Sequence, residues 1–424
     1  MAAAGSIKNA VVDSNNLCHI FNITKQALVV IIKGFTYSAV AAGIRKKDRL
    51  DLGLIFCENP AVAAGVFTAS RVKAAPVLLD MERVGRQGRA QAILVNSGVA
   101  NACTGKIGMQ VAQACSGLVA GALNIDENLV QIASTGVIGE QVPVDNIGAA
   151  MDGLVAGLSP TGYDEVARAI MTTDTVPKTA RRTCTIGGKE VKLFGMAKGA
   201  GMIMPDMATM LCFVMSDADI AADALQEHLS KGVKQSFNRI TVDGDTSTND
   251  TVLVLANCTA GNPEINTPDT EESRVFGATL EDLLRDLALQ IVADGEGATK
   301  LVTIKVINAQ SETNGDRAAR TIANSLLVKT AFFGEDANWG RIIAALGRSG
   351  VEFDQNRVDI AFDDVFMVKD GLSQGPAAEK KATAVLKQKA FTVTIDLKMG
   401  KAAREIYTCD LSVDYIKINA DYRS

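Results

Sequence analysis

The segment from Ala197 to Leu211 reads AKGAGMIMPDMATML, and its glycines and Pro205 predict a tightly turned approach to a threonine. The small Ala208 stands directly before Thr209. This arrangement favours an intramolecular N-to-O acyl shift. The threonine hydroxyl attacks the carbonyl of the preceding residue most easily when that residue has a small side chain. On spacing alone, an ordinary packed turn rich in methionine remains the better interpretation of the segment.

A cut before Thr209 would give that residue a free α-amine beside its own hydroxyl. The pKa of an α-amine is about 7.7–8.0, so a useful fraction is uncharged at neutral pH and can act as a base. The chain has two histidines: His19 lies in an irregular N-terminal stretch, and the surrounding LQEHLSKG predicts a solvated His228 near a helix end. Since Ser-His-Asp and Cys-His mechanisms need a well-placed imidazole, we expect the base of any nucleophilic mechanism here not to be histidine.

The 424-residue chain has an ordinary globular composition, with 47% hydrophobic and 21% charged residues, and its length suits about two to three domains' worth of core. The formal net charge of −5 argues against a nucleic-acid partner. The apolar run 27–32 is too short for a membrane span or a secretory signal, and residues 1–32 lack the arginines of a mitochondrial transit peptide. We therefore expect a soluble, cytoplasmic protein with no membrane partner.

Glycine-rich and acidic motifs in the chain fail the tests for nucleotide and metal sites. None of the three Gly-Lys pairs is followed by Ser or Thr, as a P-loop requires. The run 198–201 starts like a dinucleotide loop, but the third glycine position is Met204. No window fits the Q/R-x-x-G-x-G/A loop by which common acetyltransferases bind coenzyme A. The acidic run 243–250 lacks EF-hand spacing and predicts a hydrogen-bonded turn.

The cysteines predict buried free thiols, because they are scattered and form no C-x-x-C pair. This spacing gives a structural zinc site no ligand set. We therefore expect no metal and no resident cofactor. The eight cysteines stand at positions 18, 57, 103, 115, 184, 212, 258 and 409.

Short β-type runs alternate with helical patterns after the irregular stretch 1–32. Such mixing predicts a layered α/β or α+β architecture, which periodicity alone does not separate. The predicted elements are strands at 92–95 and 251–255, a hairpin joining 183–186 to 191–194 through Gly187-Gly188, a helix at 279–293 capped by Thr279, a loop at 261–272, and a strand pair at 391–397 and 405–411.

Several longer segments resemble the ornithine acetyltransferase (glutamate N-acetyltransferase) family, from about Lys33 to Ser424. The matching segments are KGAGMI and MATML within 198–211, NSGVANACTG at 96–105, STGVIG at 134–139, residues 239–250, GEDANWGR at 334–341 and KINADY at 417–422. The resemblance implies an α+β fold, an αββα-type layered sandwich shared with self-processing aminopeptidases. It also implies cleavage between Ala208 and Thr209. A dispensable extension, 1–32, would precede an α chain, 33–208, and a β chain, 209–424, and the two chains would stay together as α2β2.

The resemblance also assigns roles to site residues. Thr209 is implied as the nucleophile, with its own amine as the base after cleavage, and Thr135 and Gly136 are implied as the oxyanion hole. Glu296 is expected either to pair with the cationic amine of ornithine or to help move its proton. The implied substrate-binding residues are Lys198, Thr209, Glu296, Asn419, Ser424 and one of Thr172 and Thr173.

The activity implied by the resemblance is transfer of an acetyl group from N-acetylornithine to glutamate, through an acetyl-Thr209 ester, in arginine biosynthesis. Two substrates that share one site through a covalent intermediate predict ping-pong kinetics. The sequence leaves open whether acetyl-CoA also donates the acetyl group. One alternative is a self-processing aminopeptidase of the same fold, in which water resolves the acyl-enzyme, although its relatives usually carry serine as nucleophile. Another is a binding protein that never cleaves.

Overall fold

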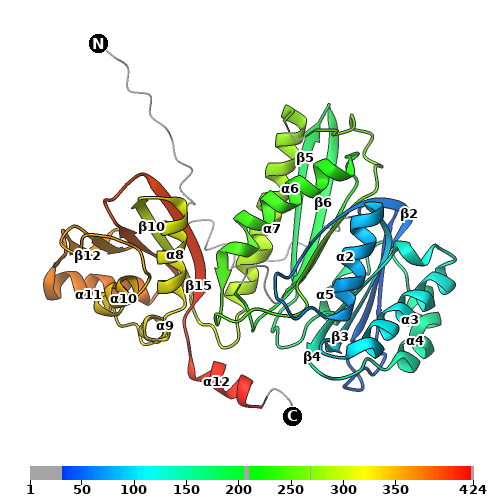
Figure 1. The fold of residues 1–424 in the computed structure, drawn as a ribbon, viewed down its shortest axis with the longest axis horizontal. Helices are drawn as coiled ribbons and strands as arrows, with labels where there is room; N and C mark the ends of the chain where they lie inside the picture. The colour runs from blue at the N-terminus through cyan, green and yellow to red at the C-terminus, as the bar shows by residue number, and fades with distance from the viewer. Residues whose placement is uncertain (1–30, 205–209, 268, 422–424) are drawn as a thin grey trace.

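An eight-stranded sheet organises the N-terminal half of the computed structural model (Figure 1), which describes residues 31–204, 210–267 and 269–421. The strand order is β4-β3-β2-β9-β7-β6-β5, and β1 pairs with β2. The strands are β1 (Phe35–Val40), β2 (Leu52–Phe67), β3 (Arg89–Val99), β4 (Val130–Val137), β5 (Lys178–Ile186), β6 (Lys189–Lys198), β7 (Leu211–Ser216) and β9 (Thr251–Ala256).

The long strand β2 joins two halves of this sheet, because its register with β3 shifts between Phe56 and Ala61. Irregularities of this kind bend a strand. The bend folds the half containing β1, β3 and β4 over the half containing β9, β7 and β6, and a core closes between them. Ile93 and Val95 of β3 lie in one buried cluster with Phe213 of β7.

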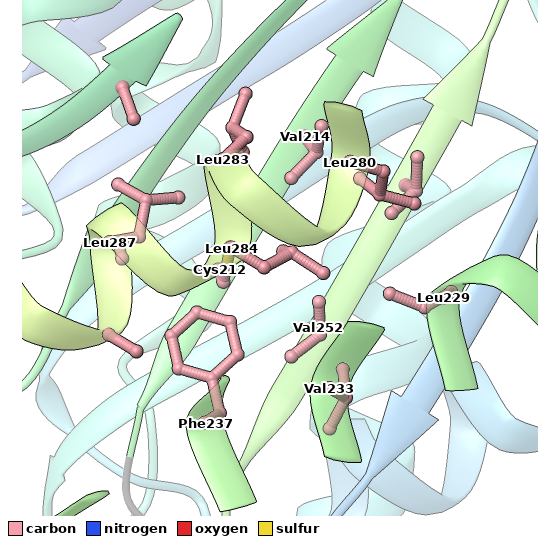
Figure 2. Close-up of a cluster of buried hydrophobic side chains, with 14 of the residues drawn as sticks. Cys212, Val214, Leu229, Val233, Phe237, Val252, Leu280, Leu283, Leu284 and Leu287 are labelled. Carbon is pink, nitrogen blue, oxygen red and sulfur yellow. The ribbon is translucent and has the colours of Figure 1, made fainter. Parts of the chain in front are cut away.

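Helices cover the outer face of each half. Successive strand residues point to opposite faces, so Ala92 and Leu94 of β3 pack toward α3 and α4, while Cys212 and Val214 of β7 pack toward α6 and α7 (Figure 2). The layers therefore run helix, sheet, sheet, helix, and the predicted αββα-type sandwich is confirmed. The helices of this lobe are α2 (Ala75–Gln87), α3 (Gly105–Leu123), α4 (Val144–Ala156), α5 (Tyr163–Ala169), α6 (Ala222–Gln235) and α7 (Glu271–Ala293).

A second, seven-stranded sheet forms a separate lobe, with the order β13-β12-β11-β14-β10-β15-β8 (Figure 1). Its helices share one apolar core with it. The final helix, α12 (Val413–Ala420), runs from this lobe back toward the first. The elements are β8 (Ile240–Thr241), β10 (Leu301–Ala309), β11 (Asp359–Phe362), β12 (Val365–Lys369), β13 (Leu372–Ser373), β14 (Ala390–Asp396), β15 (Ala402–Cys409), α8 (Glu312–Ala323), α9 (Leu326–Phe333), α10 (Trp339–Gly347) and α11 (Gly375–Leu386).

The predicted strands and the Gly187-Gly188 hairpin are confirmed by β3, β9 and the antiparallel pair β5 and β6. The prediction that the two C-terminal strands pair with each other is wrong. Both strands exist, but β14 pairs with one edge of β10 and β15 pairs with the other. The helix predicted from 279 begins earlier. Thr270 caps it by accepting from the backbone N–H of Ser273, and the Thr279 hydroxyl donates to Val275 inside the helix. The predicted loop therefore ends at residue 270.

The prediction that His228 is solvated is wrong. His228 is buried between α6 and α7, where its Nε2 lies 2.6 Å from the Ser273 hydroxyl, and burial lowers the pKa of the imidazole. The seven described cysteines are free thiols as predicted, but their burial is not uniform, because Cys103 and Cys258 are exposed. At the N-terminus, Ile32 is already part of the inner core.

Across the described part of the chain, no helix combines the length and the apolar character that a bilayer span requires.

Candidate active site

A cavity of about 110 Å³ opens where the ends of β4 and β6 approach α12. Seven of the predicted site residues line it, although they come from distant parts of the chain. Ala208, Thr209 and Ser424 lie outside the described residues, and the chain resumes at Met210. The predicted residues on the cavity wall are Thr135, Gly136, Thr172, Thr173, Lys198, Glu296 and Asn419.

One corner of the cavity is formed by Thr135 and Gly136 near the end of β4. Gly136 has a φ of +133°, and a Cβ there would lie 2.2 Å from the carbonyl carbon of Gly98. Only glycine fits this close approach of two backbones. The Thr135 hydroxyl accepts a hydrogen bond from the Lys198 ammonium, with Nζ 3.3 Å from Oγ1. A hydroxyl that accepts from a cation keeps its own proton for another acceptor.

Lys198 is the buried cation of the cavity, with 3% of its surface exposed. Burial lowers its pKa, and the carboxylate of Asp174 opposes this shift. The effect on Asp174 runs the other way. Burial alone would raise the pKa of Asp174, but the ammonium groups of Lys198 and Lys178 outweigh it and hold the pKa well below its usual range. The Asp174 carboxyl is therefore ionised at neutral pH.

Asp174 also connects the cavity walls to each other. Its Oδ2 accepts from the Thr172 N–H at 2.9 Å, and its Oδ1 accepts from the Gly199 N–H at 2.7 Å. Oδ1 also accepts from the buried Lys178 at 2.7 Å, and Lys178 reaches Asp294 at 2.5 Å. One carboxylate thus fixes the Thr172-Thr173 turn relative to the end of β6. The sequence does not indicate this role, because a single aspartate after two threonines carries no sign of its burial.

Glu296 and Asn419 form another part of the cavity wall. Asn419 of α12 donates from Nδ2 to Glu296 Oε2 at 2.7 Å. The Glu296 N–H donates to the Ala200 carbonyl at 2.9 Å, which brings the carboxylate onto Gly201. A Cβ at Gly201 would lie 2.4 Å from the carboxyl carbon, so this glycine allows the close approach.

The acidic run 243–250 holds both flanks of the segment that contains residues 205–209. Asp243 accepts from the N–H groups of Met202 and Ile203 at 2.6 and 2.9 Å. Asp250 accepts from the Met210 N–H at 3.0 Å, and burial raises the pKa of Asp250 well above its usual range. The hydrogen-bonded turn predicted here is confirmed, because Asp243 also accepts from Asp245 N–H at 3.2 Å. The sequence did not indicate that the turn anchors the neighbouring segment.

Residues 36–424 of the chain match the ArgJ family. The chain is 58% identical over 393 residues to the arginine biosynthesis bifunctional protein ArgJ of Desulfotalea psychrophila, covering 93% of this chain and 100% of that protein. It is 52% identical over 393 residues to the ArgJ protein of Geobacter sulfurreducens, again covering 93% and 100%. A crystal structure of the Bacillus halodurans ArgJ protein is 44% identical, with a TM-score of 0.47, covering 49% of this chain and 97% of that one.

Proposed function

Because this chain belongs to the ArgJ family, we propose that it is an acetyltransferase of arginine biosynthesis that moves an acetyl group from N-acetylornithine to glutamate. The Desulfotalea psychrophila and Geobacter sulfurreducens relatives are named bifunctional, and acetyl-CoA is the second acetyl donor in this proposal. The observation that carries the proposal is the convergence of Thr135, Gly136, Lys198 and Glu296 on one cavity.

The first step is self-cleavage before Thr209. The hydroxyl of Thr209 attacks the carbonyl carbon of Ala208, and the C–N bond breaks, which frees the Thr209 amine and leaves an ester. Water then hydrolyses this ester and releases the Ala208 carboxylate and the Thr209 hydroxyl. The products are an α chain of residues 33–208, preceded by the extension 1–32, and a β chain of residues 209–424. Hydrogen bonds from Met202 and Ile203 to Asp243 and from Met210 to Asp250 support this step, because the two carboxylates fix the described residues on both sides of the cleavage point.

Acetyl transfer follows at the same hydroxyl. With the α-amine as base, Thr209 attacks the acetyl carbonyl of N-acetylornithine, and the developing oxyanion accepts from the Thr135 hydroxyl and the Gly136 N–H. Lys198 supports the first donor, because its ammonium occupies a lone pair of Thr135 and leaves the hydroxyl proton for the oxyanion. The C–N bond then breaks, and protonated ornithine leaves. The α-amine of glutamate attacks the ester and regenerates Thr209.

The cavity's charges suit amino-acid substrates. In this proposal the Lys198 ammonium binds a substrate carboxylate and the Glu296 carboxylate pairs with the cationic amine of ornithine. The presence of both residues on the cavity wall supports this assignment. Hydroxyls of Thr172 or Thr173 and the amide of Asn419 add neutral donors, and Ser424 completes the set in this proposal. We further propose a cytoplasmic α2β2 assembly of the two cleaved chains.

Incubation of the purified protein with N-acetylornithine and glutamate tests the function. N-acetylglutamate and ornithine should appear in equal amounts, with ping-pong kinetics. Release of free acetate alone would instead support the aminopeptidase-like alternative, in which water resolves the acyl-enzyme. An uncleaved, inactive chain of 44.6 kDa on a denaturing gel would support a binding protein.

A further inference from the structure

A second cavity, of about 250 Å³, adjoins the first and shares Gly136, Thr172 and Thr173 with it. Its outer wall is the loop 45–49, whose sequence RKKDR places four cationic residues among five in a chain of net charge −5. Arg45, Lys46 and Arg49 of this loop line the cavity, whereas Lys47 is not among its lining residues. Gly136, a predicted oxyanion-hole residue, thus lines both the first cavity and the second cavity with its basic loop.

Hydrogen bonds hold this basic loop at both of its ends. Arg49 donates from Nη2 to the carbonyl of Met171, the residue directly before Thr172. Asp51, which is buried and follows the loop, accepts from the N–H groups of Ala42 and Ile44, which precede it, at 2.7 and 2.6 Å. The Asp51 carboxylate is therefore engaged by backbone donors at the base of the loop. These hydrogen bonds fix the loop whose cations line the cavity.

Acidic groups reduce but do not cancel the positive charge that the loop 45–49 gives to the second cavity. Asp51 and Asp421 also line the cavity, and Arg45 pairs with Glu140 at 3.3 Å. The side chain of Glu140 is half exposed, so solvent weakens that pair. Lys46 and Arg49 add two further cations next to the same wall. Clustered guanidinium and ammonium groups of this kind suit phosphate oxygens, which accept several charge-assisted hydrogen bonds at once.

We propose that this second cavity binds the phosphate-bearing carrier of an acyl thioester, acetyl-CoA, with its phosphates on the loop 45–49. The proposal rests on the proposed function. In this proposal the thioester carbonyl lies at Gly136 in the first cavity. The carrier then passes Thr172 and Thr173, which line both cavities, and reaches the second cavity. In the reaction the C–S bond breaks, the ester bond to Thr209 forms, and the thiol leaves with the proton taken from the hydroxyl. N-acetylornithine carries no phosphate and does not need the basic loop.

The test compares Lys46→Glu with the matched control Lys47→Glu, which makes the same charge change one residue away from the cavity lining. Self-cleaved protein of each kind is assayed with glutamate and either acetyl-CoA or N-acetylornithine as donor. Lys46→Glu should lower kcat/KM for acetyl-CoA on the order of tenfold, mainly through KM, because a phosphate contact turns repulsive. With N-acetylornithine it should stay within about twofold of wild type, and Lys47→Glu should behave like wild type with both donors.

A second comparison isolates the phosphates. S-acetylpantetheine offers the same thioester without them, so Lys46→Glu and wild type should use it equally well. The wild-type KM for acetyl-CoA should also rise with salt more steeply than that of Lys46→Glu, since added ions screen the contact.

Three results would overturn the proposal. Equal losses with both donors would mean that the loop contacts the amino-acid substrates, and equal effects of the two lysine variants would mean that only net charge matters. The third is a wild-type enzyme that makes N-acetylglutamate from N-acetylornithine yet shows no calorimetric binding of coenzyme A. That result leaves the proposed acetyl transfer intact and removes the carrier site alone.

Discussion

Replacing Asp174 with asparagine removes one buried charge and keeps the shape of the side chain. Asp174 accepts from Lys178 and from two backbone N–H groups, and it lies beside the buried Lys198. Breaking a buried ion pair by removing one partner costs about 3–5 kcal/mol. Lys178 keeps its contact with Asp294 at 2.5 Å, so we expect a loss near the lower bound, about 3 kcal/mol.

The stabilising effect of Asp174 should depend on pH in a defined direction. Its pKa in the folded protein lies well below the ordinary value of 3.8, because the two lysines outweigh the effect of burial. A carboxyl with a lowered folded pKa stabilises fully above its unfolded pKa and loses that effect as the pH falls toward the folded value. The difference in stability between wild type and Asp174→Asn should therefore be constant from neutral pH to about pH 5 and shrink only below about pH 4.

Thermal unfolding, followed by circular dichroism, measures both effects. A loss of about 3 kcal/mol corresponds to a fall in Tm of about 6–12 °C for a lobe of this size. The matched control is Asp282→Asn, which breaks the half-exposed contact with Arg182 and should cost less than about 1 kcal/mol. Equal Tm values for the two variants would refute the argument, as would a difference that grows on acidification. The kcat/KM for N-acetylornithine should also fall for Asp174→Asn, because the turn at Thr172 loses its acceptor.

Three further substitutions test the cavity itself. Thr135→Val should lower kcat about a hundredfold or more in a steady-state assay with N-acetylornithine, because one oxyanion donor is lost; a change of less than tenfold would contradict that role. Gly136→Ala should abolish turnover, since the added Cβ would lie 2.2 Å from a backbone carbon of Gly98, and a crystal structure or Tm should show the displacement. Gly201→Ala should raise the KM for N-acetylornithine on the order of tenfold by pushing Glu296 away; an unchanged KM would argue against contact between Glu296 and the substrate.

Local sequence patterns predicted much of the fold but not its long-range pairings. The apolar runs 92–95 and 251–255 mark β3 and β9, and the hairpin of β5 and β6 is specified by two adjacent glycines. The partner of β14 could not be predicted from local patterns. Strand β10, which lies almost a hundred residues earlier in the chain, inserts between β14 and β15. The start of α7 was missed because Thr279 resembles a cap, while the cap that forms is Thr270.

The site shows the same division. Motif resemblance selected Thr135, Lys198 and Asn419, and the fold brings them to one cavity. Asp174 was missed because its effect depends on two lysines and two N–H groups that only the fold assembles. The loop 45–49 is a run of charged residues in the sequence. It lies beside Gly136 because β2, which follows the loop, pairs with β3, and β3 pairs with β4.

The most direct test of the account is the intact mass of the purified protein, measured before and after incubation with N-acetylornithine in the absence of glutamate. We predict two chains, one of them beginning at Thr209. That chain should gain the mass of one acetyl group, located at Thr209 by fragmentation and removed on addition of glutamate. The Thr209→Ala variant should remain a single unacetylated chain. A wild-type protein that stays uncut, or one that carries the acetyl group at another residue, would contradict the account.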